Sequence, residues 1–147
     1  EFNDLFDFLY EMKYGKKPNE ENYPNGIPKE EFENVVRTYF DIPAEQLEAY
    51  ARYDSEQGVY PWEAIGPWNR VQQFQPFPEV VKCEENGDGI WTLYVEAVFV
   101  EEGTDCSFQH EVTMKEMDGR WIYLGNKVDR DGSYSIPGYK ARREFIE

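Results

Sequence analysis

Histidine and cysteine are scarce in this chain of 147 residues. It has one histidine, His110, and two cysteines, Cys83 and Cys106. A structural zinc site needs several such side chains at short spacing. The stretch "DRDG" at 129–132 lacks the regularly spaced oxygen ligands of a calcium-binding loop. The sequence also lacks a glycine-rich phosphate loop and a serine elbow. It therefore predicts no metal site and no cofactor.

Basic residues are few as well, with 15 lysines and arginines against 30 acidic residues and a formal net charge of -15. Such a surface repels phosphate backbones, so nucleic acid is excluded as a partner. No apolar run approaches the roughly 20 residues that span a bilayer, so no membrane insertion of this segment is expected. A basic protein, a sugar or a cation stays open as a partner, and the alternative is that the acidic residues serve solubility alone.

An initiator methionine and a signal peptide are also lacking, because the chain opens "EFNDLFDFLY". We expect the chain to be an excised segment, or a processed mature region, of a longer protein.

Hydrophobic residues, in contrast, make up 40% of the chain and aromatic residues 17%, which is enough for a packed core. The length suits one domain. We predict a single α+β domain over residues 1–147, divided into a helical part, an irregular aromatic-rich link, a β meander and a C-terminal tail, at 1–53, 54–78, 79–128 and 129–147.

Three helices are expected in the first part. Apolar residues in "FNDLFDFLY" recur at the helical period, and this helix should end near Gly15. "IPKEEFENVVRTYF" repeats the stripe and begins at Pro28, and "DIPAEQLEAYAR" restarts at Pro43 and runs to about Arg52.

The second part reads as strands. The runs "EVVKCEE", "IWTLYVEAVFVE", "CSFQHEVTMKEM" and "RWIYLGNKV" are separated by "NGDG", "EGTD" and "DG", which are turn sequences. They predict a four-stranded antiparallel meander, with the helices packed on one of its faces. The tail is expected to wrap back across the sheet, with a short terminal helix as one option, and a short strand is possible around residues 70–74.

The register places the histidine. If the "EGTD" turn is symmetric, Glu101 pairs with Cys106 and Ala97 with His110. His110 then points to the apolar side of the sheet, either as a neutral core residue or as the floor of a pocket that binds ligand or moves a proton. Cys106 lies four residues away, roughly 13 Å along a strand, so a thiol–imidazole pair is excluded.

The cysteines can be placed in the same way. The "NGDG" turn sets Cys83 opposite Thr92, about 30 Å along the strand from the partner of Cys106. A disulfide needs α-carbons within roughly 7 Å. Two free thiols are therefore predicted.

Aromatic residues gather in the irregular link, at Tyr60, Trp62, Trp68, Phe74 and Phe77. A long stretch without periodicity often marks a lid or a binding loop. These rings could stack on a sugar or a peptide, or they could pack against the open end of the sheet.

This order of elements resembles the cone-shaped α+β domains of the nuclear-transport-factor-2-like and cystatin-like group. The stretches "IPKEEFENVVRTYFDIPAEQLEAYARYD", "GVYPWE", "GDGIWTLYVEAVF" and "GRWIYLGNKV" also look similar to domains of unknown function in envelope lipoproteins of gut Gram-positive bacteria. The first resemblance implies a pocket between helices and sheet, which some members use for acid–base catalysis with Asp, His and Tyr. Only His110 stands at a matching position here, and no Asp on the apolar face matches a general base.

From these observations we predict a non-enzymatic, extracytoplasmic domain, secreted or lipid-anchored, that binds a small molecule, a sugar or another protein. Its site would be the helix–sheet pocket, roofed by residues 60–77, with the candidate residues His110, Tyr94, Tyr123, Trp62 and Trp68. Tyr94 lies on the opposite sheet face by parity and belongs to the site only if that face is the functional one. A small isomerase or dehydratase that uses His110 as proton carrier, and a purely structural module, stay open as alternatives.

Overall fold

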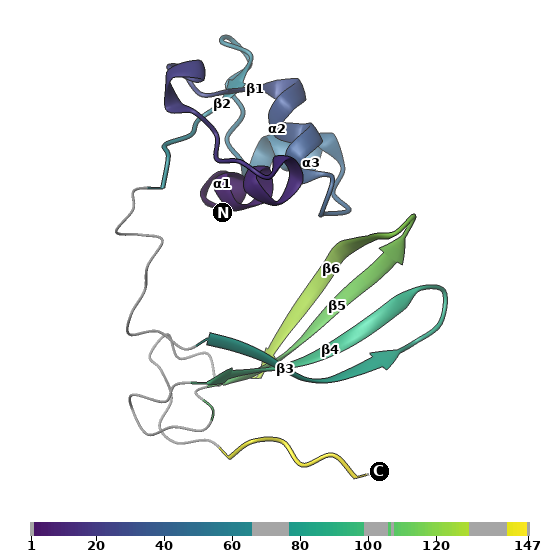
Figure 1. The fold of residues 1–147 in the computed structure, drawn as a ribbon. Coiled ribbons are helices and arrows are strands. Elements are labelled where there is room, and N and C mark those ends of the chain that lie inside the picture. Colours follow the sequence, from purple (N-terminus) through teal and green to yellow (C-terminus); the bar gives the residue numbers. More distant parts are fainter. Residues whose placement is uncertain (1, 66–76, 99–105, 107, 130–140, 147) are drawn as a thin grey trace. The chain divides into compact units, whose positions relative to one another are not determined.

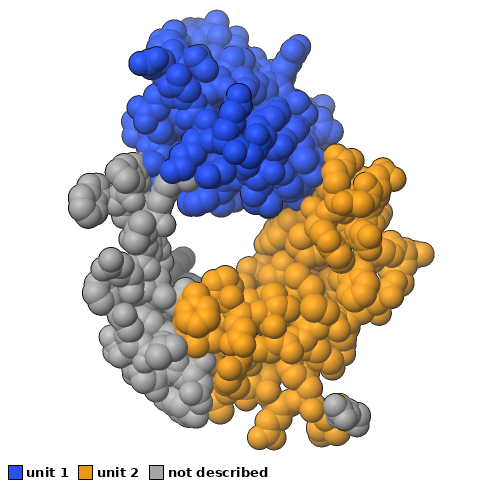
Figure 2. Space-filling view, in the orientation of Figure 1, with its two compact units in different colours: residues 1–71 blue, residues 72–147 orange. Residues whose placement is uncertain are grey.

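The computed structural model divides the chain into two compact units, residues 1–71 and 72–147 (Figures 1 and 2). Each unit is described by itself. The described residues are 2–65, 77–98, 106, 108–129 and 141–146.

Unit 1 is the helical part. It contains α1 (Phe2–Tyr14), a 3-10 turn (Glu20–Asn22), β1 (Ile27–Pro28), α2 (Lys29–Val36), α3 (Ala44–Tyr50) and β2 (Val59–Tyr60). The three predicted helices are confirmed, and α2 and α3 are shorter than expected at their C-terminal ends. Pro28 and Pro43 stand immediately before them, where a missing backbone N–H and a fixed φ disturb no helical hydrogen bond.

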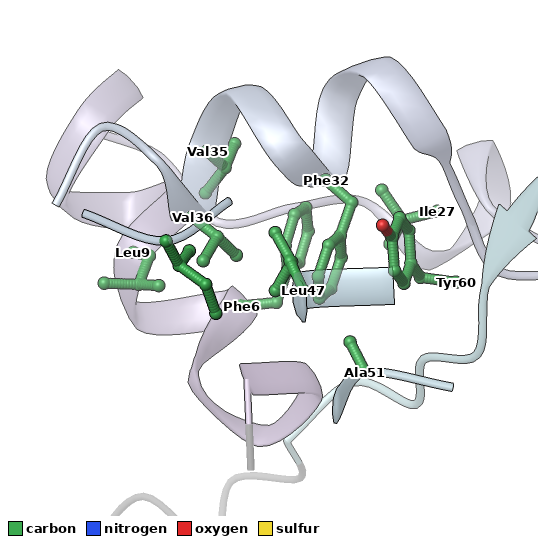
Figure 3. Close-up of a cluster of buried hydrophobic side chains, with 10 residues drawn as sticks. Phe6, Leu9, Ile27, Phe32, Val35, Val36, Leu47, Ala51 and Tyr60 are labelled. Atoms are coloured by element: carbon green, nitrogen blue, oxygen red, sulfur yellow. The ribbon is translucent and has the colours of Figure 1, made fainter. Parts of the chain in front are cut away.

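The core of unit 1 is a column of aromatic rings drawn from three elements (Figure 3). The rings of Phe6 on α1 and Phe32 on α2 stack at 5.4 Å between centroids, and Phe32 stacks on Tyr60 of β2 at 4.2 Å. Ten of the described residues form this buried apolar cluster: Phe6, Leu9, Ile27, Phe32, Val35, Val36, Ile42, Leu47, Ala51 and Tyr60. The apolar stripes read from the sequence therefore face one another.

The small sheet of β1 and β2 was missed by the sequence analysis, because two-residue strands show no alternation. Ile27 pairs with Tyr60. Just before β1, Gly26 adopts φ +108°, and a Cβ at this position would lie 2.4 Å from the Tyr60 carbonyl oxygen. Only glycine permits so close a backbone approach.

Unit 2 is the predicted meander, an antiparallel sheet in the order β3-β4-β5-β6. Its strands are β3 (Phe77–Glu85), β4 (Ile90–Val98), β5 (Gln109–Met117) and β6 (Arg120–Asp129). The α+β class, with helices preceding a four-stranded antiparallel sheet, is confirmed. The packing of the helices on the sheet and the single domain stay predictions.

The predicted register between β4 and β5 was wrong by two residues. His110 pairs with Val95, not with Ala97, whose backbone N–H donates to the Phe108 carbonyl oxygen at 2.9 Å. The predicted register rests on a symmetric turn at "EGTD", whose residues lie outside the described part of the chain. A shift of two preserves the face, so His110 still shares the face of Val95.

The register at the first hairpin was wrong by one residue. Cys83 pairs with Leu93, not with Thr92, because Glu85 is paired with Trp91 rather than with Ile90, the first residue of β4. A shift of one moves Cys83 to the other face. The predicted absence of a disulfide is confirmed, with Cys83 exposed and Cys106 buried.

Residues 141–146 of the tail form neither helix nor strand, and their contacts with β3, β4 and β5 confirm that they lie across the sheet. The short terminal helix is absent from this range. The possible strand at 70–74 falls outside the described residues. Among the helices that the structure describes, none has the length and apolar character to cross a bilayer.

Candidate functional site

One face of the sheet carries a polar cluster, here called the Glu96 face. Strand alternation places Tyr94 and Glu96 of β4 on the same side, and their neighbours across the strands share it. The cluster consists of Glu79, Lys82 and Glu84 on β3, Tyr94 and Glu96 on β4, and Gln109 on β5. His110 lies on the opposite face, here called the His110 face.

Glu96 is the centre of the site. This residue is 1% exposed, although its side chain is a carboxylate. One carboxylate oxygen accepts from Arg142 Nε at 2.6 Å, and the other from the Arg143 backbone N–H at 2.7 Å. Gln109 Nε2 donates to the same carboxylate at 3.3 Å and also to the Ala141 carbonyl oxygen at 3.3 Å. A buried carboxylate is thus satisfied by a segment about 46 residues away in sequence.

Arg142 joins two carboxylates through one guanidinium group. Its Nε contacts Glu96, and its second terminal nitrogen contacts Glu79 Oε2 at 2.7 Å. Such charge-assisted hydrogen bonds are shorter and stronger than neutral ones. The next residue, Arg143, donates from its side chain to the His110 carbonyl oxygen at 3.4 Å.

An aromatic and cationic stack forms the second half of the site. The ring of Phe145 meets that of Tyr94 edge to face at 5.3 Å between centroids. Lys82 Nζ lies 4.7 Å from the Phe145 ring centroid, and the Arg143 guanidinium lies 5.4 Å from the Tyr94 ring. Both separations are within the range of cation–π attraction. Glu84 fixes this stack, because it accepts from the Tyr94 hydroxyl at 2.6 Å and pairs with Lys82 at 2.7 Å.

The protonation states follow from these contacts. Burial alone would raise the pKa of Glu96, but the hydrogen bonds from the Arg143 backbone and the Arg142 guanidinium outweigh it and leave the pKa below its usual value. The pKa of Arg142 is raised by Glu96 and Glu79. The hydrogen bond to Glu84 raises the pKa of Tyr94. The Glu96 carboxylate and the Arg142 guanidinium are therefore both favoured in their charged forms.

Within unit 2, the three predicted site residues on the strands, His110, Tyr123 and Tyr94, are not gathered at one place on the sheet. His110 and Tyr123 share the His110 face, where His110 Nδ1 lies 3.0 Å from Asn126 Oδ1 and Tyr123 pairs with Met114. Four residues of β5 separate His110 from Met114, roughly 13 Å. Burial raises the pKa of Tyr123. A role for His110 in proton transfer stays a prediction.

Trp62 lies in unit 1, where its indole N–H donates to Asp7 Oδ1 at 2.7 Å and its ring packs against Phe6 and Tyr23. Trp68, Phe74 and most of the predicted pocket roof lie outside the described residues. Of the three candidates on the described strands of unit 2, Tyr94 is the one on the Glu96 face.

Glu96 and the two arginines of the tail were not among the residues predicted from the sequence. Two signals could have found them. Glu96 interrupts the apolar run "IWTLYVEAV", on the same parity as Tyr94, and "ARREF" is a basic patch in a chain of net charge -15. Among the residues that the structure describes, no group of three His, Cys, Asp or Glu side chains is placed to hold a metal ion.

Comparisons with known proteins give one match. The model of a family of unknown function, DUF6070, matches residues 1–142, a range that includes the Glu96 face and Arg142. Searches of curated proteins and of solved structures gave no match. The chain therefore belongs to the DUF6070 family, whose function is unknown.

Proposed function

We propose that this chain is a non-enzymatic binding domain and that its Glu96 face is a receptor surface for an extended, basic polypeptide segment. The observation that carries the proposal is Glu96 itself, a carboxylate with 1% exposure that is satisfied by Arg142, Arg143 and Gln109. A buried charge is costly unless it is paired and hydrogen-bonded. A basic segment on this face supplies that pairing, and residues 141–146 show how such a segment is held.

The contacts between the tail and the Glu96 face support recognition of a segment by its side chains. Residues 141–146 add no strand to the sheet. The side chains of Arg142 and Phe145 contact the Glu96 face, and the backbone takes part through the Arg143 N–H and the Ala141 carbonyl oxygen. Both oxygens of the Glu96 carboxylate accept hydrogen bonds. This arrangement favours a role in binding over a role in proton transfer.

The test is binding in trans. The chain ending at Lys140 is mixed with a fluorescently labelled peptide of residues 140–147, "KARREFIE", and the anisotropy is followed. We expect saturable binding. Glu96→Gln in this receptor should weaken binding at least about ten-fold, because the guanidinium loses its charged acceptor. Glu85→Gln is the matched control, since Glu85 is exposed and pairs with Trp91 on the His110 face.

Two results would contradict the proposal: no binding by a receptor whose circular dichroism shows an intact fold, or equal binding by the Glu96→Gln and Glu85→Gln receptors. Should the shortened chain not fold, the full chain carrying Arg142→Ala and Phe145→Ala serves as the receptor, because it keeps the tail backbone and loses both side-chain anchors.

The setting we propose is extracytoplasmic, in a secreted or surface-anchored bacterial protein. The support is the resemblance of "GDGIWTLYVEAVF" and "GRWIYLGNKV" to envelope lipoprotein domains. Protease treatment of intact cells tests it, because a surface domain is cleaved while a cytoplasmic control protein is spared.

A further inference from the structure

Resting on the proposed function, we infer that the partner's segment carries an arginine followed three residues later by an aromatic residue, and that the chain's own tail competes for the site in cis. The spacing is that of Arg142 and Phe145. These two residues occupy the carboxylate pair and the aromatic stack, whereas Glu144 between them is exposed.

The first position selects arginine over lysine. Glu96 and Glu79 stand on neighbouring strands and meet two different nitrogens of one guanidinium, at 2.6 Å and 2.7 Å. The planar fork of arginine presents both nitrogens at fixed geometry, whereas the ammonium of lysine is a single point charge on a flexible stem. The Arg143 backbone N–H, 2.7 Å from Glu96, fixes the segment beside this position.

The aromatic position selects a ring through two contacts. Phe145 meets Lys82 Nζ at 4.7 Å from its centroid, and it meets the Tyr94 ring edge to face. An ammonium over a ring face and an edge-to-face pair both depend on the quadrupole of the aromatic ring. An aliphatic side chain of similar size would supply neither contact.

The tail contacts a buried carboxylate, but its own side chains remain partly exposed. The side chain of Arg142 remains 40% exposed and Phe145 37% exposed, whereas Glu96 beneath them is buried. A segment tethered to its own receptor acts at an effective concentration of the order of millimolar. A partner must displace it, so the free chain is expected to bind weakly until the tail is removed or weakened.

The experiment measures the labelled peptide on three receptors: the full chain, the chain ending at Lys140, and the full chain with Arg142→Ala and Phe145→Ala. We expect the full chain to bind at least about ten-fold more weakly than the shortened chain. The double variant should recover most of that loss. Peptides with the first arginine changed to lysine, or the phenylalanine to alanine, should each bind the shortened chain about ten-fold more weakly than the parent peptide.

The outcomes separate the two proposals. Equal binding by the full and shortened chains overturns competition by the tail, and equal binding by the parent and alanine peptides overturns the aromatic position. Light scattering that shows a concentration-dependent dimer, lost in Arg142→Ala, would mean that the tail fills the site of a second copy and would overturn competition in cis. Absence of binding by every peptide to every folded receptor contradicts the proposed function itself.

Discussion

Two buried acidic residues, one in each unit, attach a remote segment to a helix or strand. In unit 1, Asp7 of α1 is 2% exposed and accepts from the Trp62 indole and the Ile65 backbone N–H at 2.7 and 2.9 Å. In unit 2, Glu96 of β4 does the same for residues 142 and 143. Removing one partner of a buried charge leaves the other without compensation, which is more damaging than losing an exposed pair. These two carboxylates therefore position irregular segments that no repeating backbone pattern holds.

A residue-scale prediction concerns glycine. Gly26→Ala should destabilise unit 1 by several kcal/mol, because the new Cβ would lie 2.4 Å from the Tyr60 carbonyl oxygen. Gly15→Ala is the matched control: Gly15 also has positive φ, but no atom lies within 4 Å of the added Cβ, so only about 1–2 kcal/mol of backbone strain is expected. Urea unfolding followed by circular dichroism gives both values. Equal losses would mean that the close approach at Gly26 is absent in solution.

At the scale of elements, the long periodic patterns were predictable and the short or asymmetric ones were not. The stripe in "FNDLFDFLY" gave α1, and alternation gave the four strands, because burial imposes these periods on many residues at once. β1 and β2 were missed because two residues carry no period. The pairing of Cys83 was predicted wrongly because the turn at "NGDG" shifts the pairing of the two strands by one residue. The prediction that Tyr94 and His110 lie on opposite faces of the sheet was right. The tail was predicted to cross the sheet, but the residues that it contacts there were not predicted.

A prediction at the scale of elements concerns the effect of low pH on the tail. The lowered pKa of Glu96 means that its bonds to the tail stabilise the folded state above the usual carboxylate range near 4 and are lost as pH falls through the lowered pKa. The groups facing Glu96 are Glu79 on β3, Gln109 on β5, and Arg142 and Arg143 on the tail. The Arg143 backbone amide in proton–nitrogen NMR spectra should therefore titrate with a midpoint below the ordinary glutamate value.

The same titration in Glu79→Gln is the control, because Glu79 bonds the Arg142 side chain and not this amide. Glu96→Gln should remove the transition. A midpoint at or above the ordinary glutamate value in the unmodified chain would show that Glu96 does not hold the tail in its charged form.

At the scale of the whole molecule, the apolar core is unevenly distributed. The ten-residue cluster belongs to unit 1, whereas the buried apolar residues on the described strands of unit 2 are Val95, Ala97, Val98 and Ile122. Hydrophobic burial is the dominant favourable term in folding. Unit 1 thus has a core of its own, while unit 2 depends more on its strand ladder and on polar contacts such as those of Glu96.

A fragment of residues 1–71 is therefore expected to fold alone. Thermal unfolding by circular dichroism should show a cooperative transition, and Phe32→Ala should lower the free energy of unfolding by about 3–5 kcal/mol. Tyr50→Ala serves as a control, because Tyr50 is 59% exposed. A fragment without a cooperative transition would instead support the prediction of a single domain.

The different surroundings of the two thiols also provide a labelling position in the unmodified chain. Cys83 is exposed, while Cys106 is 0% exposed and its Sγ lies 3.0 Å from the Phe108 carbonyl oxygen. A maleimide dye should attach at Cys83 and leave Cys106 unmodified until that region opens. Because Cys83 pairs with Leu93, the dye would sit on the His110 face, away from the residues that hold the tail. Reaction of the second thiol would then time the opening of the structure around Cys106.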